Sequence, residues 1–85
     1  LMANVELYTK DYCPFCRRAV ALLTQKGVEF SNTDILDHPA QRDVMITRAN
    51  GHSTVPQIFI NDAHIGGCDD LFALEYQGKL DALLA

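Results

Sequence analysis

The chain has 85 residues and a formal net charge of −4, which allows one small domain with a single core and leaves no room for a second. The acidic balance argues against a duplex-binding protein, because such proteins present a basic face. No apolar run approaches the ~20 residues needed to cross a bilayer, so neither a nucleic acid nor a membrane is expected as a partner.

The N-terminal half of the chain predicts a strand, a helix and a second strand. Residues 5–9 alternate between apolar and polar side chains and are rich in strand formers, which is typical of a half-buried strand. Pro14 suits the first turn of the helix, where its missing N–H is not needed, and Gly27 is expected to end the helix as a left-handed cap. The second strand is predicted over residues 28–33.

The C-terminal half predicts a helix, a β-hairpin and two further helical segments. Pro39 suits the opening turn of the first of these helices, and its inner stripe is expected to contain Val44, Met45 and Ala49. The other predicted elements are strands over residues 57–60 and 63–65, a helix over residues 68–76, and a last helical turn or two over residues 80–84.

This order of elements predicts an α/β fold for a single domain over residues 3–85. A βαβ unit makes the first two strands parallel, and a tight turn makes the last two antiparallel. The result is a four-stranded mixed sheet flanked by helices, expected to act as a monomer. Leu1 stands before Met2 and is interpreted as a residue added ahead of the natural start.

Cys13 and Cys16 are the first candidates for chemistry, because they lie where the first strand ends and the first helix begins. A helix N-terminus presents unpaired N–H groups and a partial positive charge, which together stabilise a thiolate. Cys13 precedes the helix and is expected to be the exposed nucleophile. Cys16 lies about one turn further in and suits the resolving thiol, while Lys10 adds positive charge nearby.

A metal knuckle and a pair of inert core thiols are the alternatives for these two cysteines. Zinc usually takes four ligands, and neither Cys68 nor the histidines form a second close pair, so no metal site is predicted. An odd number of cysteines with one C-x-x-C pair is typical of catalytic thiols in a reducing compartment. A cytoplasmic location is therefore expected.

Thr54, Val55 and Pro56 directly precede the most strand-like run of the chain. Proline is tolerated at the first residue of a strand. A cis peptide bond before Pro56 would leave the N–H and C=O of Val55 available to an extended peptide, whereas the trans form is the more frequent one. These residues alone leave both alternatives open.

Residues 66–70, with the sequence GGCDD, open the third predicted helix. The glycines allow a ligand to approach the backbone, where the amides of Cys68 and Asp69 offer N–H groups to a carboxylate and the Asp69 side chain suits an ammonium group. The alternative is a glycine turn followed by acidic residues that complement the helix dipole. His52 and His64 are interpreted as surface residues, and the Cys68 thiol as a bystander.

Together the motifs at residues 13–16, 54–56 and 66–70 resemble those of the glutaredoxin family, within the thioredoxin fold. The resemblance covers nearly the whole chain and is closest to the small bacterial dithiol members of the glutaredoxin 3 type. Phe15 replaces the tyrosine common between the two cysteines, and Tyr12 replaces a small hydroxyl residue. Monothiol relatives that carry iron–sulfur clusters have serine at the second cysteine position, so the second cysteine of this chain argues against that branch.

The resemblance implies a thioredoxin-like fold and a glutathione-dependent disulfide oxidoreductase with no bound cofactor and glutathione as cosubstrate. It implies that Cys13 is the attacking thiolate, that Cys16 is the resolving thiol and that Pro56 is cis. The glutathione-binding residues that it implies are Lys10, Phe15, Thr54, Val55, Pro56, Gly67, Cys68 and Asp69, with Lys10 or Arg42 at the glycyl carboxylate.

The partners expected from this resemblance are glutathione and disulfide-containing or glutathionylated proteins, with ribonucleotide reductase as a further candidate. Two rival functions are an electron donor reduced by thioredoxin reductase and a non-catalytic metal or iron–sulfur binding module. Residues 66–70 argue against the first rival, and the second cysteine of the C-x-x-C pair argues against the second.

Overall fold

The structure is a computed structural model that describes residues 2–85; Leu1, to which the interpretation as an added residue applies, lies outside the described residues. The elements in chain order are β1 (Val5–Thr9), α1 (Pro14–Gln25), β2 (Ser31–Asp34), α2 (Gln41–Arg48), β3 (Gln57–Ile60), β4 (Ala63–Gly66), α3 (Cys68–Tyr76) and α4 (Leu80–Leu84). None of the helices in this part of the chain is long and apolar enough to cross a membrane.

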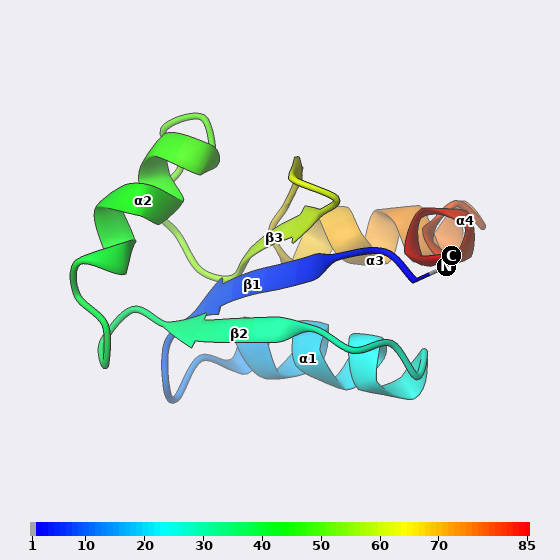
Figure 1. Ribbon diagram of the computed structural model, residues 1–85. Helices are drawn as coiled ribbons and strands as arrows, with labels where there is room; N and C mark the ends of the chain where they lie inside the picture. The colour runs from blue at the N-terminus through cyan, green and yellow to red at the C-terminus, as the bar shows by residue number, and fades with distance from the viewer. Residues whose placement is uncertain (1) are drawn as a thin grey trace.

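A four-stranded mixed sheet forms the centre of the domain (Figure 1). The strands lie in the order β2-β1-β3-β4, with β1 and β2 parallel and β3 antiparallel to both β1 and β4. Helix α1 connects the parallel pair, as a βαβ unit requires. Asn61 and Asp62 connect β3 to β4 and both have a positive φ, which is the backbone of a two-residue hairpin turn. The predicted mixed sheet is confirmed.

Helices α1 and α3 cover one face of the sheet and enclose the larger of two cores. Alternate residues of a strand point to the same face, so every second residue of β1 and β3 packs against these helices. Along α1 the inward residues recur at helical spacing, and Gly27, with a φ of +73°, ends the helix as predicted. The buried members of this core are Val5, Leu7, Ala19, Leu22, Leu23, Ile58, Ile60, Leu71, Leu80 and Leu84.

The opposite face of the sheet carries α2, which lies apart from the other helices in Figure 1. Its buried core is smaller and consists of Tyr8, Ile35, Met45, Ala49 and Phe59. Tyr8 and Phe59 come from β1 and β3, one residue out of step with the residues of the larger core. Met45 is the one buried residue within α2, so the apolar contact of this helix is narrow.

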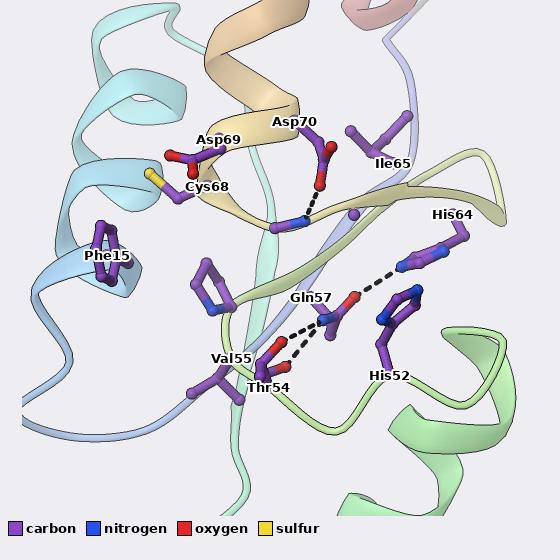
Figure 2. A pocket seen from close by; sticks show the side chains of 13 residues that line it. Phe15, His52, Thr54, Val55, Gln57, His64, Ile65, Cys68, Asp69 and Asp70 are labelled. Carbon is purple, nitrogen blue, oxygen red and sulfur yellow. Dashed lines mark hydrogen bonds between the residues drawn. The ribbon is translucent and has the colours of Figure 1, made fainter.

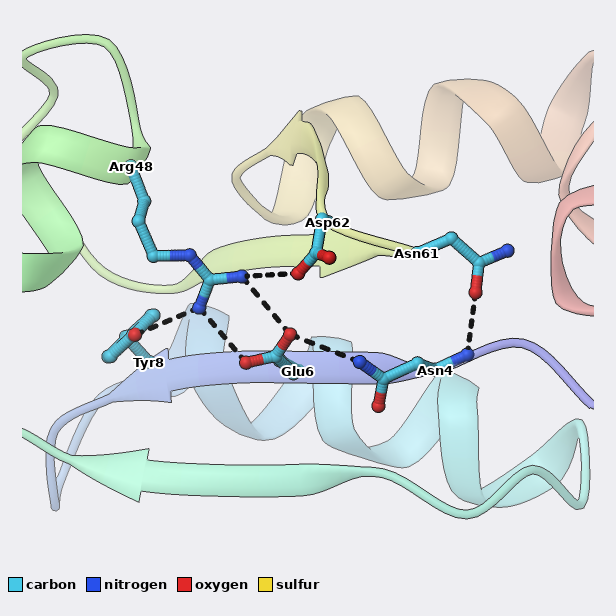
Figure 3. A network of polar contacts seen from close by, with 6 residues as sticks. All are labelled: Asn4, Glu6, Tyr8, Arg48, Asn61 and Asp62. Atoms are coloured by element: carbon cyan, nitrogen blue, oxygen red, sulfur yellow. Dashed lines mark hydrogen bonds and ion pairs between the residues drawn. The ribbon is translucent and has the colours of Figure 1, made fainter.

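Arg48, the last residue of α2, adds a polar attachment to this face (Figure 3). Its guanidinium donates to both carboxylate oxygens of Glu6 at 2.9 and 3.1 Å and to the hydroxyl of Tyr8 at 3.0 Å. The same group lies 4.2 Å from the centre of the Phe59 ring, within the range of a cation–π contact. The hydrogen bond from Arg48 holds the pKa of the Glu6 carboxyl below its ordinary value. Arg48 therefore fixes the end of α2 to the sheet.

The second strand lies later in the chain than predicted. The prediction placed it over residues 28–33, but the pairing with β1 runs from Ser31 to Asp34. Val28 and Phe30 have strand-forming side chains, yet they pack against the edge of the larger core. Their burial, rather than strand pairing, accounts for the apolar residues in this segment.

The second helix also differs from its prediction at two points. It begins at Gln41, so Pro39 precedes the helix instead of occupying its opening turn. Val44 is 42% exposed, which makes its predicted inward position wrong. The helix contacts the sheet through a single narrow stripe that contains Met45 and Ala49, and Val44 lies outside that stripe.

Candidate active site

Cys13 is the N-cap residue of α1 and has an extended backbone with φ −101° and ψ 109°. Its Sγ accepts a hydrogen bond from the backbone N–H of Cys16 at 3.2 Å. This N–H has no acceptor within the helix, so the sulfur acts as a side-chain cap. No acidic residue occurs in the first turn of α1, and the positive end of the helix dipole faces the half-buried sulfur.

Cys16 lies one turn further along α1 and is 3% exposed. Burial raises the pKa of its thiol to about 12, and the hydrogen bond with Cys13 contributes to the rise. At neutral pH the Cys16 thiol is therefore protonated, and it is covered by protein. The two thiols of the motif thus differ sharply in their surroundings, although they are three residues apart.

The loop before β3 brings Val55 against the Cys13 sulfur. The peptide bond between Val55 and Pro56 is cis, as the family resemblance implied. Cys13 Sγ lies 3.8 Å from the carbonyl oxygen of Val55. Within residues 2–85 the backbone N–H of Val55 donates no hydrogen bond, so a donor and an acceptor of one residue lie beside the nucleophile.

The start of α3 forms the facing wall. Gly66 has a φ of +118°, which favours glycine, and a Cβ there would collide with the carboxylate of Asp70. That carboxylate accepts a hydrogen bond from the N–H of Gly67 at 2.9 Å. The next N–H groups, those of Cys68 and Asp69, have no acceptor within the helix. An anion would therefore meet N–H donors here, with the exposed Asp69 carboxylate beside them.

A groove of about 560 Å³ joins these segments (Figure 2). All of the predicted binding residues except Lys10 line it, namely Phe15, Thr54, Val55, Pro56, Gly67, Cys68 and Asp69. Lys10 instead lines a separate hollow of about 380 Å³, together with Cys16 and Arg17. Arg42 is exposed on α2 and lines neither of the two. The structure thus brings together residues from three distant parts of the chain.

Phe15 and Cys68 are groove residues of opposite character. Phe15 is 54% exposed, so its ring is a surface of the groove rather than part of the core. Cys68 is buried, and burial raises the pKa of its thiol. The Cys68 thiol is therefore protonated at neutral pH, in agreement with its interpretation as a bystander.

Gln57, His52 and His64 also line the groove and were not among the residues expected to bind glutathione. His52 is exposed as predicted, and His64 is partly buried where it lines the groove. Gln57 is 3% exposed, and a buried amide needs hydrogen-bond partners. A glutamine that opens an otherwise apolar strand was the signal that could have marked this position.

The known proteins that this chain is similar to in sequence and fold are glutaredoxins. The family model described as glutaredoxin matches residues 5–65. The chain is 59% identical to glutaredoxin 3 of Escherichia coli K12 over 83 residues, which is 98% of this chain and 99% of that protein. It is similar to the solution structure of glutaredoxin from Brucella melitensis, with 53% identity, a TM-score of 0.83 and coverage of 98% and 89% of the two chains. It is also similar to the crystal structure of a buckwheat glutaredoxin–glutathione complex, with 30% identity, a TM-score of 0.87 and coverage of 96% and 76%.

Proposed function

Since this chain belongs to the glutaredoxin family and is a dithiol thiol–disulfide oxidoreductase, we propose that it reduces glutathionylated proteins and protein disulfides through Cys13 and Cys16. Glutaredoxins use glutathione as cosubstrate, and the proposal gives this chain the same reductant. The observation that carries it is the half-buried Cys13 sulfur at the start of α1, between the N–H of Cys16 and the backbone of Val55.

In the first reaction the Cys13 thiolate attacks the glutathione sulfur of a mixed disulfide. The old S–S bond breaks, the target leaves as a thiolate that takes up a proton, and a disulfide forms between Cys13 and glutathione. The thiolate of a second glutathione then attacks this disulfide, which releases oxidised glutathione and restores Cys13. Each cycle consumes one free glutathione, which leaves joined to the glutathione of the substrate as oxidised glutathione, and no bound cofactor takes part.

We place glutathione along the groove between Val55 and the start of α3. The N–H groups of Cys68 and Asp69 suit its γ-glutamyl carboxylate, and the Asp69 side chain suits the adjacent ammonium group. The free N–H and the C=O of Val55 suit the cysteinyl part. Lys10 is exposed, lies close to Cys13 in the sequence and is assigned to the glycyl carboxylate, although it lines the second hollow and not the groove itself. Phe15, Thr54, Pro56 and Gly67 complete the walls.

The second reaction uses both cysteines. After Cys13 has attacked a protein disulfide, the Cys16 sulfur attacks the resulting mixed disulfide, passes its proton to the departing target thiolate and closes a disulfide with Cys13. Glutathione then opens that disulfide in two exchanges. The raised pKa of Cys16 supports this division of roles, because a thiol that stays protonated does not compete with Cys13 for the first attack.

The targets in this proposal are glutathionylated or disulfide-containing proteins, with ribonucleotide reductase as one candidate. We assign the protein to the cytoplasm, since thiols such as Cys13 and Cys16 stay reduced there. Two exposed aromatic side chains lie close to Cys13 in the sequence, Tyr12 at 83% and Phe15 at 54% exposure; Phe15 lines the groove and Tyr12 lines the second hollow. These rings are available to a target polypeptide next to the nucleophile.

The direct test is turnover of a small glutathionylated disulfide by glutathione, coupled to glutathione reductase and NADPH. Rapid turnover is expected for the wild-type protein and none for Cys13→Ser, because serine supplies no thiolate. The proposal would be overturned if the folded wild-type protein with reduced thiols showed no turnover in this assay, and if thioredoxin reductase rapidly reduced the oxidised protein.

Cys16→Ser provides the matched control for the roles of the two thiols. This variant keeps Cys13, so it should retain turnover of the glutathionylated substrate. It should lose most of its ability to reduce a protein disulfide, which needs ring closure. Loss of both activities in Cys16→Ser would show that the two thiols do not divide the work in this way.

A further inference from the structure

Four residues beside the groove are joined by hydrogen bonds into what we call the Thr54 relay: Asn50, His64, Gln57 and Thr54. Asn50 Nδ2 lies 3.3 Å from His64 Nδ1, and His64 Nε2 lies 2.7 Å from Gln57 Oε1. Gln57 Nε2 donates to the carbonyl oxygen of Thr54 at 2.9 Å and to its hydroxyl at 3.3 Å. Figure 2 shows the last three residues in line along the groove. The relay connects the end of α2 with the loop that carries Val55.

The direction of every hydrogen bond in the Thr54 relay follows from its last member. The Thr54 carbonyl oxygen only accepts, so the atom of Gln57 that faces it is the amide nitrogen. Gln57 Oε1 is then the acceptor toward His64, and His64 donates from Nε2. In the neutral ring Nδ1 carries no proton and accepts from Asn50. The relay therefore requires one particular tautomer of His64.

The His64 donor matters because Gln57 is almost fully buried. Gln57 is 3% exposed, so a water molecule cannot take the place of His64 at Gln57 Oε1. Loss of the His64 donor therefore leaves a buried acceptor unsatisfied. The amide would then be free to turn and to set its oxygen against the Thr54 carbonyl. Thr54 directly precedes Val55, whose carbonyl oxygen lies 3.8 Å from Cys13 Sγ.

We propose that His64 is a positioning residue, which acts through Gln57 to hold the backbone of Thr54 and Val55 in the orientation that receives glutathione. The inference rests on the proposed function, because it takes glutathione to lie along this groove. His64 is assigned no contact with glutathione. Its contribution is the Nε2–H donor and the order that this donor imposes on Gln57.

The other groups around His64 are consistent with a neutral ring. Its ring lies 5.3 Å from that of Phe59 and 5.9 Å from that of His52. Burial and the neighbouring His52 lower the pKa of His64, and Asp70 opposes them. A proton gained in acid would enter at Nδ1, so the bond from Nε2 to Gln57 would persist. Removal of Nε2–H should therefore have the same effect on either side of this titration.

His64→Phe is the decisive variant, because it keeps a ring against Phe59 and removes both nitrogens. KM for the glutathionylated substrate should rise about two- to ten-fold, the factor that corresponds to one net hydrogen bond, with kcat little changed. The rise should be similar at about pH 6 and pH 8. Alkylation of Cys13 by iodoacetamide, which needs no bound glutathione, should keep its wild-type rate.

His52→Phe and His64→Gln complete the set. His52 is the matched comparison, since it is a histidine in the same groove with no hydrogen bond to Gln57, and its replacement should raise KM less than His64→Phe does. His64→Gln supplies an amide donor and should restore part of the affinity. An equal rise in both phenylalanine variants, or no rise in His64→Phe, would overturn the proposal.

Nitrogen NMR of the glutathione-free protein tests the Thr54 relay separately from catalysis. The expected signature at neutral pH is a neutral His64 with its proton on Nε2. A proton on Nδ1 would overturn the relay whatever the turnover. Failure of the proposed function would look different: the wild-type protein would turn over no glutathionylated substrate, while His64 would still show the expected tautomer. In that case the positioning role would fail together with the proposed function, and only the hydrogen-bond geometry of the relay would stand.

Discussion

The two faces of the sheet differ in the amount of apolar surface that each buries and in the polar contacts that accompany it. The face covered by α1 and α3 encloses ten buried apolar residues, whereas the face covered by α2 encloses five. The smaller core is supplemented by Arg48, whose guanidinium binds Glu6 and lies over Phe59. Lys26, near the larger core, also forms ion pairs, with the partly buried Glu75 and the exposed Asp81.

This difference bears on the active site, because each face supplies one part of it. Cys13 and Cys16 belong to α1, and the N–H donors belong to α3, so both come from the face with the larger core. The loop with Thr54 and Val55 follows α2 and depends on the smaller one. The nucleophile is therefore held by extensive burial, whereas the loop that faces it is held by a few buried side chains and directional hydrogen bonds.

The largest effect is expected from Leu23→Ala in the larger core. Leu23 is fully buried, and α1 is packed against both the sheet and α3, so the cavity cannot collapse. The free energy of unfolding should fall by about 3–4 kcal/mol, measured by urea denaturation with an unchanged slope. A loss near 1 kcal/mol would mean that the packing around α1 adapts easily.

Met45→Ala makes the corresponding change in the smaller core. Met45 is also fully buried, but α2 has few other attachments and can move toward the sheet. The free energy of unfolding should fall by about 2–3 kcal/mol, which is at the lower end for a truncation of this kind. Hydrogen exchange should accelerate in α2 and not in α1. Equal acceleration in both helices would show that the two faces open as one unit.

Arg48→Met removes the polar attachment of α2 and keeps much of its apolar contact. The free energy of unfolding should fall by about 1–2 kcal/mol, since hydrogen bonds to a charged group are broken. Because Arg48 lowers the pKa of Glu6 in the folded state, this contribution is fully present above the ordinary Glu6 value of 4.5 and is lost as the pH falls through the lowered value. The difference in unfolding free energy between wild type and variant should therefore shrink below that pH, and a constant difference would contradict the assignment.

Lys26→Met should have the smallest effect of the four. Lys26 Nζ lies 2.7 Å from carboxylate oxygens of both the partly buried Glu75 and the exposed Asp81. Ion pairs that water can reach contribute little, and Lys26 lacks the ring contact that Arg48 makes with Phe59. No loss beyond experimental error is expected in a thermal melt at physiological salt. A loss as large as that of Arg48→Met would remove the distinction between the two sets of ion pairs.

The elements with strong local signals were predictable from the sequence. Pro14 and Gly27 mark the two ends of α1 through their backbone preferences, and the structure places helix ends at both. Burial was harder to predict. Val28 and Phe30 resemble strand residues because they are apolar, yet they pack beside the larger core without strand pairing. Helical spacing alone also did not show how narrow the stripe of α2 would be, and Val44 lies outside it.

The residues of the candidate site likewise divide into those that the sequence predicts and those that it does not. The motif residues Cys13, Val55 and Gly67 were identified from short segments whose chemistry is local. The hydrogen bond between Gln57 and His64 was not, because it depends on the register of the β3–β4 hairpin. That register shifts at an irregularity between Ile58 and Phe59. No local pattern in the sequence specifies such a shift, and it decides which side chains meet in the groove.

The buried Cys16 thiol also ties the energy of target reduction to the proton concentration of the surroundings. Cys16 keeps its proton up to about pH 12, so closure of the Cys13–Cys16 disulfide releases that proton together with two electrons. Each proton released with the two electrons lowers the midpoint potential by about 30 mV for each unit of pH. In a more alkaline medium the midpoint potential of these two thiols is therefore lower, but that of a target disulfide that takes up two protons on reduction falls at least as steeply, so the driving force toward such a target does not grow.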